Sequence, residues 1–396
     1  MKMHLFVLIL VLIVTLLPDL WIYARIRSKI STLFLRILFW VPALLFITFF
    51  VTLALKADAL DNYKATAQIM WGFWMFFVLY IPKFCYGIFD LTHYICKRMF
   101  KFKRSPFQWI GIVLGLVSMV LLIYGAFVGK NNLVIKESTL AFKNFPEKLN
   151  GLKIVQISDL HLGNWNDNTE TIERMVKLVN EQQPDIIICS GDVVNNFADE
   201  LPLFIPILQN LKAKYGKFAV MGNHDYGDYS KWNSEKERDV NLEKIKQGIR
   251  ECGFDLLLNE HEILEISGEK LKIVGVENWG EPPFMQYGEL DESLGKIGAK
   301  VFTLLISHDS SHFSGEVIQY PEVNLTLSGH THAAQFGIFT KKFQWSPSKW
   351  KYEHYAGLYQ HGEQYLYVNR GIGFVGVPMR IGATPEITVL TLEHQK

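Results

Sequence analysis

The first third of this 396-residue chain contains four long apolar segments, which constrain the fold more than any other feature of the sequence. The first of them, residues 5–17, carries no charged side chain. A helix of about 20 mostly apolar residues is long enough to cross the hydrocarbon core of a bilayer. We therefore expect a membrane anchor over residues 1–131. Its four transmembrane helices are expected at about residues 4–24, 33–55, 67–95 and 107–128.

The first apolar segment also has the length of a secretory signal peptide. However, Lys2 is the only strong charge before it, no small-x-small cleavage pattern follows it, and three more apolar segments come after it. We therefore interpret it as a retained helix. Lys83, within the third segment, is expected to extend its ammonium group toward the lipid headgroups, since polar residues follow it closely.

The short loops predict the orientation in the membrane, because Lys and Arg near span ends remain in the cytoplasm. Two loops are rich in them, with Arg25, Arg27, Lys29 and Arg36 after the first span and Lys97, Arg98, Lys101, Lys103 and Arg104 after the third. The loop between the second and third spans has no such excess. This pattern predicts a multi-pass plasma (inner) membrane protein whose termini and C-terminal domain are extracytoplasmic. If the basic loops are only solvated turns, the orientation stays open.

The overall composition excludes several classes of protein. Hydrophobic residues make up 49% of the chain and the formal net charge is only +1, so a basic surface for gripping nucleic acid is not expected. The four cysteines have neither the regular spacing of a disulfide framework nor that of a zinc knuckle. Nucleic acid is therefore not an expected partner, and the cysteines indicate no particular redox compartment.

Residues 132–396 have the alternating pattern of an α/β domain. Short runs rich in Val and Ile alternate with amphipathic, helix-like stretches. Strands are expected at residues 152–157, 186–188, 218–220, 301–306, 323–327, 364–368 and 387–392, with a hairpin over residues 261–276. Helices are expected at residues 169–181, 201–211 and 241–251. These 265 residues are enough for one large catalytic domain with its own core.

Polar side chains of the kind that bind metals follow five of these strands directly. The carboxyl ends of strands form the ligand-binding edge of an open α/β sheet, so we expect these side chains to meet at one site. A set of Asp, Asn and His without thiolate suits Zn, Mn, Fe or a similar divalent ion. Two ions sharing one carboxylate would use all seven candidates, which are Asp159, His161, Asp192, Asn223, His308, His330 and His332.

These polar residues carry a resemblance to a known family. The sequence resembles the calcineurin-like metallophosphoesterase superfamily in five ordered blocks: Asp159-x-His161, Gly191-Asp192, Gly222-Asn223-His224-Asp225, His308 and Gly329-His330-x-His332. The Ser307-His308-Asp309 form and the tail around Arg370 and Arg380 are similar to a bacterial membrane-associated branch. That branch usually has Gly-Gly where this chain has Ala333-Ala334. The fold it implies is a four-layer αββα double β-sheet sandwich, of mixed α/β and α+β character.

The resemblance also implies a role for each residue of the blocks. It assigns Asp159, His161 and His332 to one divalent ion and Asn223, His308 and His330 to a second, with Asp192 bridging them. The ions would be Mn, Zn or Fe. The implied chemistry is attack on phosphorus by metal-bound hydroxide.

His224 and Asp225 are expected to be catalytic residues of this site. The resemblance implies that His224 protonates the leaving oxygen and that Asp225 orients the imidazole.

The leading functional prediction is a membrane-anchored, dimetal-dependent phosphoesterase. It would hydrolyse a phosphodiester, pyrophosphate or phosphomonoester, and its partners would be membrane lipids and a phosphorylated, lipid-linked substrate. One alternative is the UDP-2,3-diacylglucosamine diphosphatase activity of the branch, although such precursors are cytoplasmic and the charge pattern places the domain outside. A second alternative is a membrane scaffold with a degenerate phosphoesterase fold, which the complete ligand set argues against.

Other residues outside the metal blocks are candidates for substrate binding. Arg370 and Arg380 are expected to face the site, because a guanidinium suits a substrate phosphate, although surface ion pairs are equally compatible with the sequence. Residues 341–352, called here the lysine–aromatic segment, interleave cationic and aromatic side chains just after the last ligand. Such a segment can be a solvated loop, or it can contact headgroups and an amphiphilic substrate.

Overall fold

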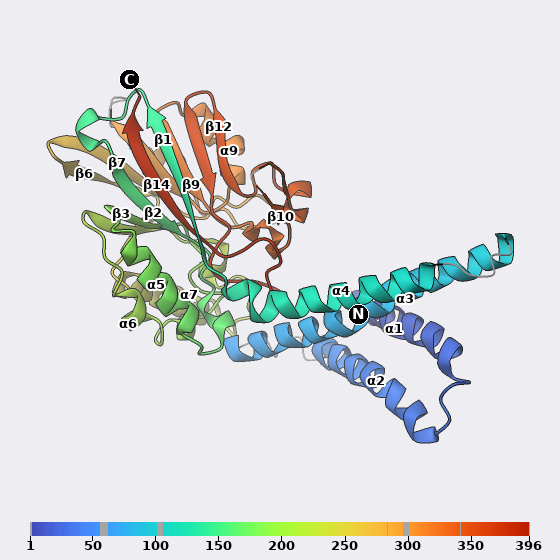
Figure 1. Ribbon diagram of the computed structural model, residues 1–396. Coiled ribbons are helices and arrows are strands. Elements are labelled where there is room, and N and C mark those ends of the chain that lie inside the picture. The colour runs from blue at the N-terminus through green and yellow to red at the C-terminus, as the bar shows by residue number, and fades with distance from the viewer. Residues whose placement is uncertain are drawn as a thin grey trace. The chain divides into compact units, whose positions relative to one another are not determined.

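The computed structural model describes residues 2–55, 62–100, 106–282, 284–295, 301–340 and 342–395 (Figure 1). The chain forms two compact units. The first, called here the membrane unit after its predicted role, consists of Met1–Leu60 and Gln68–Phe127. The second, called here the catalytic unit because it contains the predicted catalytic domain, consists of Asp61–Ala67 and Val128–Lys396.

Four helices form in the N-terminal part of the chain, as predicted. They are α1 (Lys2–Ile26), α2 (Leu33–Leu55), α3 (Tyr63–Phe100) and α4 (Phe107–Phe127). Each contains a stretch long and apolar enough to cross a membrane. The third helix is longer than expected at both ends, because the polar residues that flank its apolar centre continue the helix instead of ending it.

The membrane unit contains an ion pair that its sequence pattern did not predict. Lys83 Nζ of α3 lies 2.6 Å from Asp19 Oδ1 of α1, and the Asp19 side chain is fully buried. Tyr80 donates a hydrogen bond of 2.9 Å to the other oxygen of Asp19. The expectation that Lys83 extends alone toward headgroups is therefore corrected, because the partner comes from a different helix.

The catalytic unit is built on two six-stranded mixed sheets. The order of the first is β1 (Val134–Phe142), β14 (Glu386–His394), β2 (Leu152–Ile157), β3 (Ile186–Cys189), β4 (Gly216–Ala219) and β5 (Asp255–Leu256). The order of the second is β12 (Gly357–His361), β13 (Gln364–Val368), β9 (Val323–Ser328), β8 (Phe302–Ser307), β7 (Glu269–Val276) and β6 (Glu260–Ile266). A separate hairpin consists of β10 (Ile338–Phe339) and β11 (Gln344–Trp345).

The two sheets pack face to face and share one apolar core. Ile186, Ile188 and Leu390 of the first sheet contact this core together with Leu304 and Leu325 of the second. Alternate residues of a strand point to opposite faces, so the outer faces need separate cover. Helices α5 (Glu170–Glu181), α6 (Ile205–Leu208) and α7 (Glu235–Glu251) lie on one side (Figure 1). Helices α8 (Leu290–Leu294) and α9 (Ser311–Gly315) pack on the second sheet. The predicted double-sheet sandwich thus forms.

Parallel pairing brings the carboxyl ends of several strands to one edge. In the first sheet β2, β3 and β4 are parallel, and in the second β7, β8, β9 and β13 are parallel. Buried Gln156 of β2 links the two sheets at this edge, because its Nε2 donates to Ser190 Oγ and to the Ser328 carbonyl, both at 2.9 Å. The segments that carry the candidate metal ligands follow these strand ends.

Candidate metal centre

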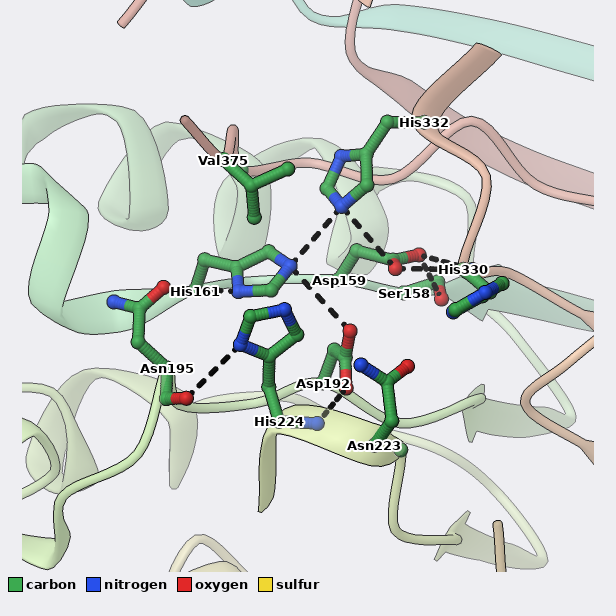
Figure 2. Close-up of polar contacts among 12 residues, drawn as sticks. Ser158, Asp159, His161, Asp192, Asn195, Asn223, His224, His330, His332 and Val375 are labelled. Atoms are coloured by element: carbon green, nitrogen blue, oxygen red, sulfur yellow. Dashed lines mark hydrogen bonds and ion pairs between the residues drawn. The ribbon is translucent and has the colours of Figure 1, made fainter. Parts of the chain in front are cut away.

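The candidate ligands meet where the strand ends of the two sheets come together (Figure 2). Three groups have ligand atoms within 4.8 Å of one another: Asp159, His161 and His332; His161, Asp192 and His224; and Asp192, His308 and His330. Asp192 Oδ2 lies 3.6 Å from His161 Nε2 and 3.2 Å from His308 Nε2. One carboxylate thus lies between two clusters of ligand-type side chains.

The backbone of these residues is unusual. Five of the seven candidates have a left-handed backbone, with φ of 51° at Asp159, 44° at His161, 56° at Asp192, 73° at His330 and 49° at His332. A left-handed non-glycine residue costs free energy and persists only where its surroundings enforce it. Such positions cluster at functional sites, so the concentration of five in one cluster is evidence for function.

Glycines permit the close approach of the ligand-bearing loops. A Cβ atom at Gly329 would collide with the Ser158 hydroxyl and the Asp159 carboxylate. Gly191 adopts φ +97°, and a side chain there would also meet Gly222. Substitution at either position would therefore push apart the loops that carry Asp159 and Asp192.

Hydrogen bonds fix the orientation of three imidazoles. Nδ1 of His308 lies 2.8 Å from the Ser190 carbonyl oxygen, and Nδ1 of His161 lies 3.1 Å from Asn195 Oδ1. Nδ1 of His224 lies 3.0 Å from the Asn195 carbonyl oxygen (Figure 2). A proton on each Nδ1 leaves the Nε2 lone pair available, and such oxygen acceptors are the usual partners of metal-binding histidines.

The chemistry of the donor set fits a cation. Among the described residues, the buried Oδ1 of Asn223 has no hydrogen-bond partner, and the buried Nε2 of His308 has only the Asp192 carboxylate nearby, at 3.2 Å. A buried polar atom without a partner costs free energy, and a metal ion would supply the missing contact. His332 Nε2 lies 3.4 Å from Asp159 Oδ1 and 3.0 Å from His161 Nε2, so these three donors also face one point.

The cluster is electrostatically strained without a cation. Burial alone would raise the pKa of Asp192, but the neighbouring imidazoles, His308 first, hold it well below its usual range. Burial raises the pKa of Asp159 to about 6. Burial opposes the charged form of His308, yet the charges of Asp192 and Asp159 raise its pKa to about 10. Two buried carboxylates thus require nearby positive charge.

Two other imidazoles stay neutral in the same environment. Burial lowers the pKa of His161 to about 3 and that of His330 to about 4. A metal ligand must present a free lone pair, so protons compete weakly with a metal ion at these two side chains.

Asp225 has a different role from the one predicted. Its Oδ2 accepts hydrogen bonds of 2.9 Å from the backbone N–H groups of Asp192 and Gly222, and its Oδ1 accepts one of 3.0 Å from Val194. His224 is instead oriented through the Asn195 carbonyl. The prediction that Asp225 orients the imidazole is therefore corrected, since the buried carboxylate holds the loop that carries Asp192.

Neither predicted substrate-binding arginine offers a free guanidinium to this site. Arg380 is buried and donates to the carbonyl oxygens of Gly373 and Ala383. Its Nη2 lies 3.0 Å from His332 Nδ1, so it positions a candidate ligand instead. Arg370 Nε donates to Glu386 Oε2 at 2.5 Å. Both expectations are corrected for one reason, which is that buried acceptors orient each guanidinium: the Glu386 carboxylate binds Nε of Arg370, and backbone carbonyls bind Arg380.

Sequence reasoning also missed residues that build the site. Asn195 contacts both His161 and His224, and Glu200 accepts backbone hydrogen bonds from Gly163 and Asn195. The only available signal was a polar pair, Asn195-Asn196, placed directly after the buried Val193 and Val194. Such a pair is common in turns, so its role follows only from the three-dimensional structure.

The end of the lysine–aromatic segment reaches the cluster. Tyr352 Oη lies 2.9 Å from His330 Nε2, which leaves Nδ1 of that imidazole for a metal ion. Lys351 Nζ lies 4.4 Å from the centroid of Phe284, whose ring packs edge-on against His330 at 4.9 Å. Further along the segment, the exposed fraction is 55% for Phe343 and 79% for Trp350. Lys341 lies outside the described residues.

Comparison with known proteins agrees with this geometry. The model of the calcineurin-like phosphoesterase family matches residues 152–334, which span all seven candidate ligands. The chain belongs to this family. A second model, described as a probable calcineurin-like phosphoesterase transmembrane domain, matches residues 3–130. The protein is thus a membrane metallophosphoesterase, a phosphoric ester hydrolase that uses divalent metal ions.

Relatives occur in bacteria and in animals. The metallophosphoesterase YkuE of Bacillus subtilis (strain 168) is 30% identical over 68% of this chain and 89% of its own length. The metallophosphoesterase Cj0846 of Campylobacter jejuni is 26% identical over 98% of both chains. A transmembrane protein with a metallophosphoesterase domain from Danio rerio is 27% identical over 70% of this chain, which spans 62% of that protein.

Proposed function

We propose that the protein is a dimetal phosphoesterase that hydrolyses a phosphodiester, pyrophosphate or phosphomonoester of a membrane-associated substrate. The observation that carries the proposal is the position of Asp192 between two buried groups of donors. One group would hold the first ion and consists of Asp159, His161 and His332. The other would hold the second and consists of His308, His330 and Asn223, whose Oδ1 lacks a partner among the described residues.

The family chemistry then divides between the ions and the protein. Bound divalent ions would supply Lewis acidity toward the phosphoryl oxygens and lower the pKa of water so that it can attack phosphorus. With Nδ1–H donating to the Asn195 carbonyl, His224 would act in its imidazolium form, giving its second proton from Nε2 to the leaving oxygen and becoming neutral. Arg380 would keep His332 in place, and Asp225 would keep the Asp192 loop in place.

Two side chains support binding of an anionic substrate beside His330. Lys351 is exposed and carries a positive charge near the imidazole, while Tyr352 Oη contacts the imidazole directly. A lysine ammonium is a suitable partner for a phosphoryl oxygen, and the neighbouring Phe284 ring offers an apolar surface for the organic part of the substrate.

The exposed part of the lysine–aromatic segment supports a lipid-linked substrate. Phe343 and Trp350 are exposed, and the cations Lys342 and Lys349 lie beside them in the sequence. Aromatic and cationic side chains together favour the headgroup region of an anionic membrane. The match of residues 3–130 to the family's transmembrane domain supports a membrane-anchored enzyme, for which a lipid-linked substrate is accessible.

Metal content and activity together test the dimetal proposal. The purified full-length protein should contain two divalent ions per chain and hydrolyse an aryl phosphodiester or monoester when supplied with Mn. Asp192→Asn should lower both the metal content and kcat/KM, the latter by more than about a hundredfold, whereas Asp199→Asn, at an exposed position, should change neither. Full metal content and activity in Asp192→Asn would overturn the bridging assignment.

The role of His224 has its own test. His224→Ala should lower kcat by about 10² to 10⁴-fold while the two metal ions are retained. The loss should be smaller for substrates with a good leaving group, because these need less protonation. His361→Ala is the matched control, since His361 is exposed on β12. An equal loss with all leaving groups would contradict the general-acid role.

A lipid assay separates the substrate proposal from the chemistry. Trp350→Ser should reduce turnover of a phospholipid in vesicles far more than turnover of the aryl phosphodiester, and Val240→Ser on α7 should reduce neither. Equal effects on both substrates would refute the lipid-surface role. A comparison of lipids from cells that carry wild type or His224→Ala, with UDP-2,3-diacylglucosamine as one candidate, would identify the natural substrate.

We further propose an extracytoplasmic catalytic unit in the plasma (inner) membrane. The support is the excess of Lys and Arg in the loops after α1 and α3, which favours a cytoplasmic position of these loops. A membrane-impermeant thiol reagent should label a cysteine introduced at exposed Lys177 in intact cells. Labelling only after lysis would indicate the opposite orientation, in which the catalytic unit is cytoplasmic and can reach a cytoplasmic lipid precursor.

A further inference from the structure

A cavity lies at the edge of the sandwich, outside the candidate metal centre. Its volume is about 460 Å³, and none of the seven candidate metal ligands lines it. Lys136 of β1 and Glu386 of β14 line it from the first sheet, and Tyr367 of β13 and Arg370 line it from the second. The β10–β11 hairpin contributes Phe339 to the same cavity. A cavity of this size is large enough for a small organic ligand.

Arg370 is the most informative residue of this cavity. Its side chain is only 4% exposed, and its Nη2 is buried without a hydrogen-bond partner among the described residues. The guanidinium lies over the Phe339 ring, with 4.9 Å from Cζ to the ring centroid. Burying an arginine donor without an acceptor costs free energy, so this nitrogen indicates a missing acceptor.

The contact with Glu386 leaves other N–H donors of the Arg370 guanidinium without an acceptor. One carboxylate oxygen accepts from Arg370 Nε, while the other accepts from Tyr367 at 2.7 Å and Thr388 at 2.9 Å. The guanidinium has five N–H donors in a planar fork, and within the described part of the chain only Nε donates to Glu386. Its remaining donors match an oxyanion better than a neutral group.

The balance of charge in the cavity is positive. Glu386 and Arg370 neutralise each other, and Lys136 adds a positive charge on an exposed β1 position. Lys136 has no ion pair within the described part of the chain. A second cation close to a buried, incompletely bonded guanidinium favours a dianionic group over a singly charged one.

We propose that this cavity binds the phosphate group of an organic phosphomonoester through Arg370 and Lys136. The cavity is larger than a phosphate ion, so the remaining space takes the organic part of the ligand, with Phe339 as an apolar wall. The same group can belong to a soluble metabolite or to a lipid such as phosphatidic acid. The site is separate from the metal centre and does not depend on the proposed dimetal chemistry.

Calorimetric titration of the metal-loaded, full-length protein with inorganic phosphate tests whether the cavity binds the phosphate group of a soluble ligand. Lys136→Met should weaken one phosphate-binding event by at least about tenfold, which is the size expected for loss of one charged contact. Lys177→Met on α5 is the matched control, since that lysine is also exposed. Asp192→Asn should leave this event intact even if it abolishes metal binding, so failure here and failure of the dimetal proposal are distinguishable.

Native mass spectrometry tests whether the ligand is a lipid headgroup, with phosphatidic acid and phosphatidylcholine as probes. Retention of phosphatidic acid that falls in Lys136→Met would support a lipid headgroup ligand. Arg370→Gln should weaken binding as well, but it also leaves Glu386 unpaired, so Lys136→Met, which keeps the buried ion pair, decides the question. If neither phosphate nor phosphatidic acid binding changes in Lys136→Met and Arg370→Gln, the proposal is overturned.

Discussion

Replacing Asp225 with asparagine distinguishes two roles for a carboxylate beside a catalytic imidazole. If Asp225 oriented His224, Asp225→Asn would change catalysis and leave the fold intact. The carboxylate instead accepts three backbone hydrogen bonds from the loops of Asp192 and Gly222. We therefore expect the substitution to destabilise the catalytic unit and to weaken metal binding, with loss of activity as a consequence.

The magnitude follows from the three contacts. Asparagine has one acceptor oxygen, so at least one of the three buried N–H groups would face an NH₂ donor. Each hydrogen bond to a charged group contributes about 1.5 to 3 kcal/mol. Burial, followed by the charge of Asp192, raises the pKa of Asp225 to about 7, so loss of the charge recovers part of this cost. We expect a net destabilisation of about 2 to 3 kcal/mol, or about 5 to 10 °C in Tm.

Thermal unfolding and metal titration of the full-length protein check this prediction. Asp225→Asn should lower Tm and metal affinity together, and excess metal should restore part of the activity. Asp199→Asn, at an exposed position, serves as the control. Unchanged Tm and metal affinity, combined with a lower kcat and a shifted acid limb of its pH profile, would refute our reasoning and restore the orienting role.

Three further predictions follow from single contacts. Metal binding at pH 7.5 should release about one proton, because His308 has a pKa of about 10 without metal and must be neutral to bind a metal ion. The buffer takes up the released proton, so the calorimetric enthalpy of metal binding should differ between Tris and HEPES, and equal enthalpies would contradict the prediction. Lys83→Met should destabilise the detergent-solubilised protein by about 3 to 5 kcal/mol, because it leaves the buried Asp19 carboxylate without its partner. Adding Asp19→Asn should restore much of the lost stability, and an unchanged stability of the single variant would show that the ion pair contributes little. Tyr352→Phe should lower kcat/KM by about 10- to 100-fold without changing Tm, and full activity would exclude a role for its hydroxyl.

The sequence predicted the helices and strands best where the pattern of apolar residues alone determines them. Helices α2 and α4 begin at the expected residues because lipid-facing positions must be apolar throughout. Strand β1 was missed, since it is a polar edge strand whose partner β14 lies about 250 residues later in the chain. The helix expected at residues 201–211 shortens to α6, because Pro202 and Pro206 remove backbone donors.

The candidate ligands were identifiable for a different reason. Each follows a strand end, so sequence position already indicates where it lies in the fold. The partners of Arg370 and Arg380 could not be predicted in this way, because Glu386 and Gly373 reach them only through tertiary packing. Sequence motifs therefore predicted which residues gather at the site, but not which acceptor each donor would select.

The contrast between Asp192 and Asp225 explains why chemistry-based assignment from sequence fails at some positions. Both carboxylates are fully buried in the same cluster, and both follow a glycine-containing turn. Asp192 turns Oδ2 toward imidazole nitrogens and accepts one backbone N–H, that of His224, with Oδ1. Both oxygens of Asp225 instead accept backbone N–H groups of two loops, one of which places Asp192 in a left-handed conformation. That strained conformation needs an acceptor to hold it, so a carboxylate is required at position 225 whether or not it contacts substrate. The ligand geometry and its backbone support therefore depend on the same residue type, and only the hydrogen-bond partners separate the two roles.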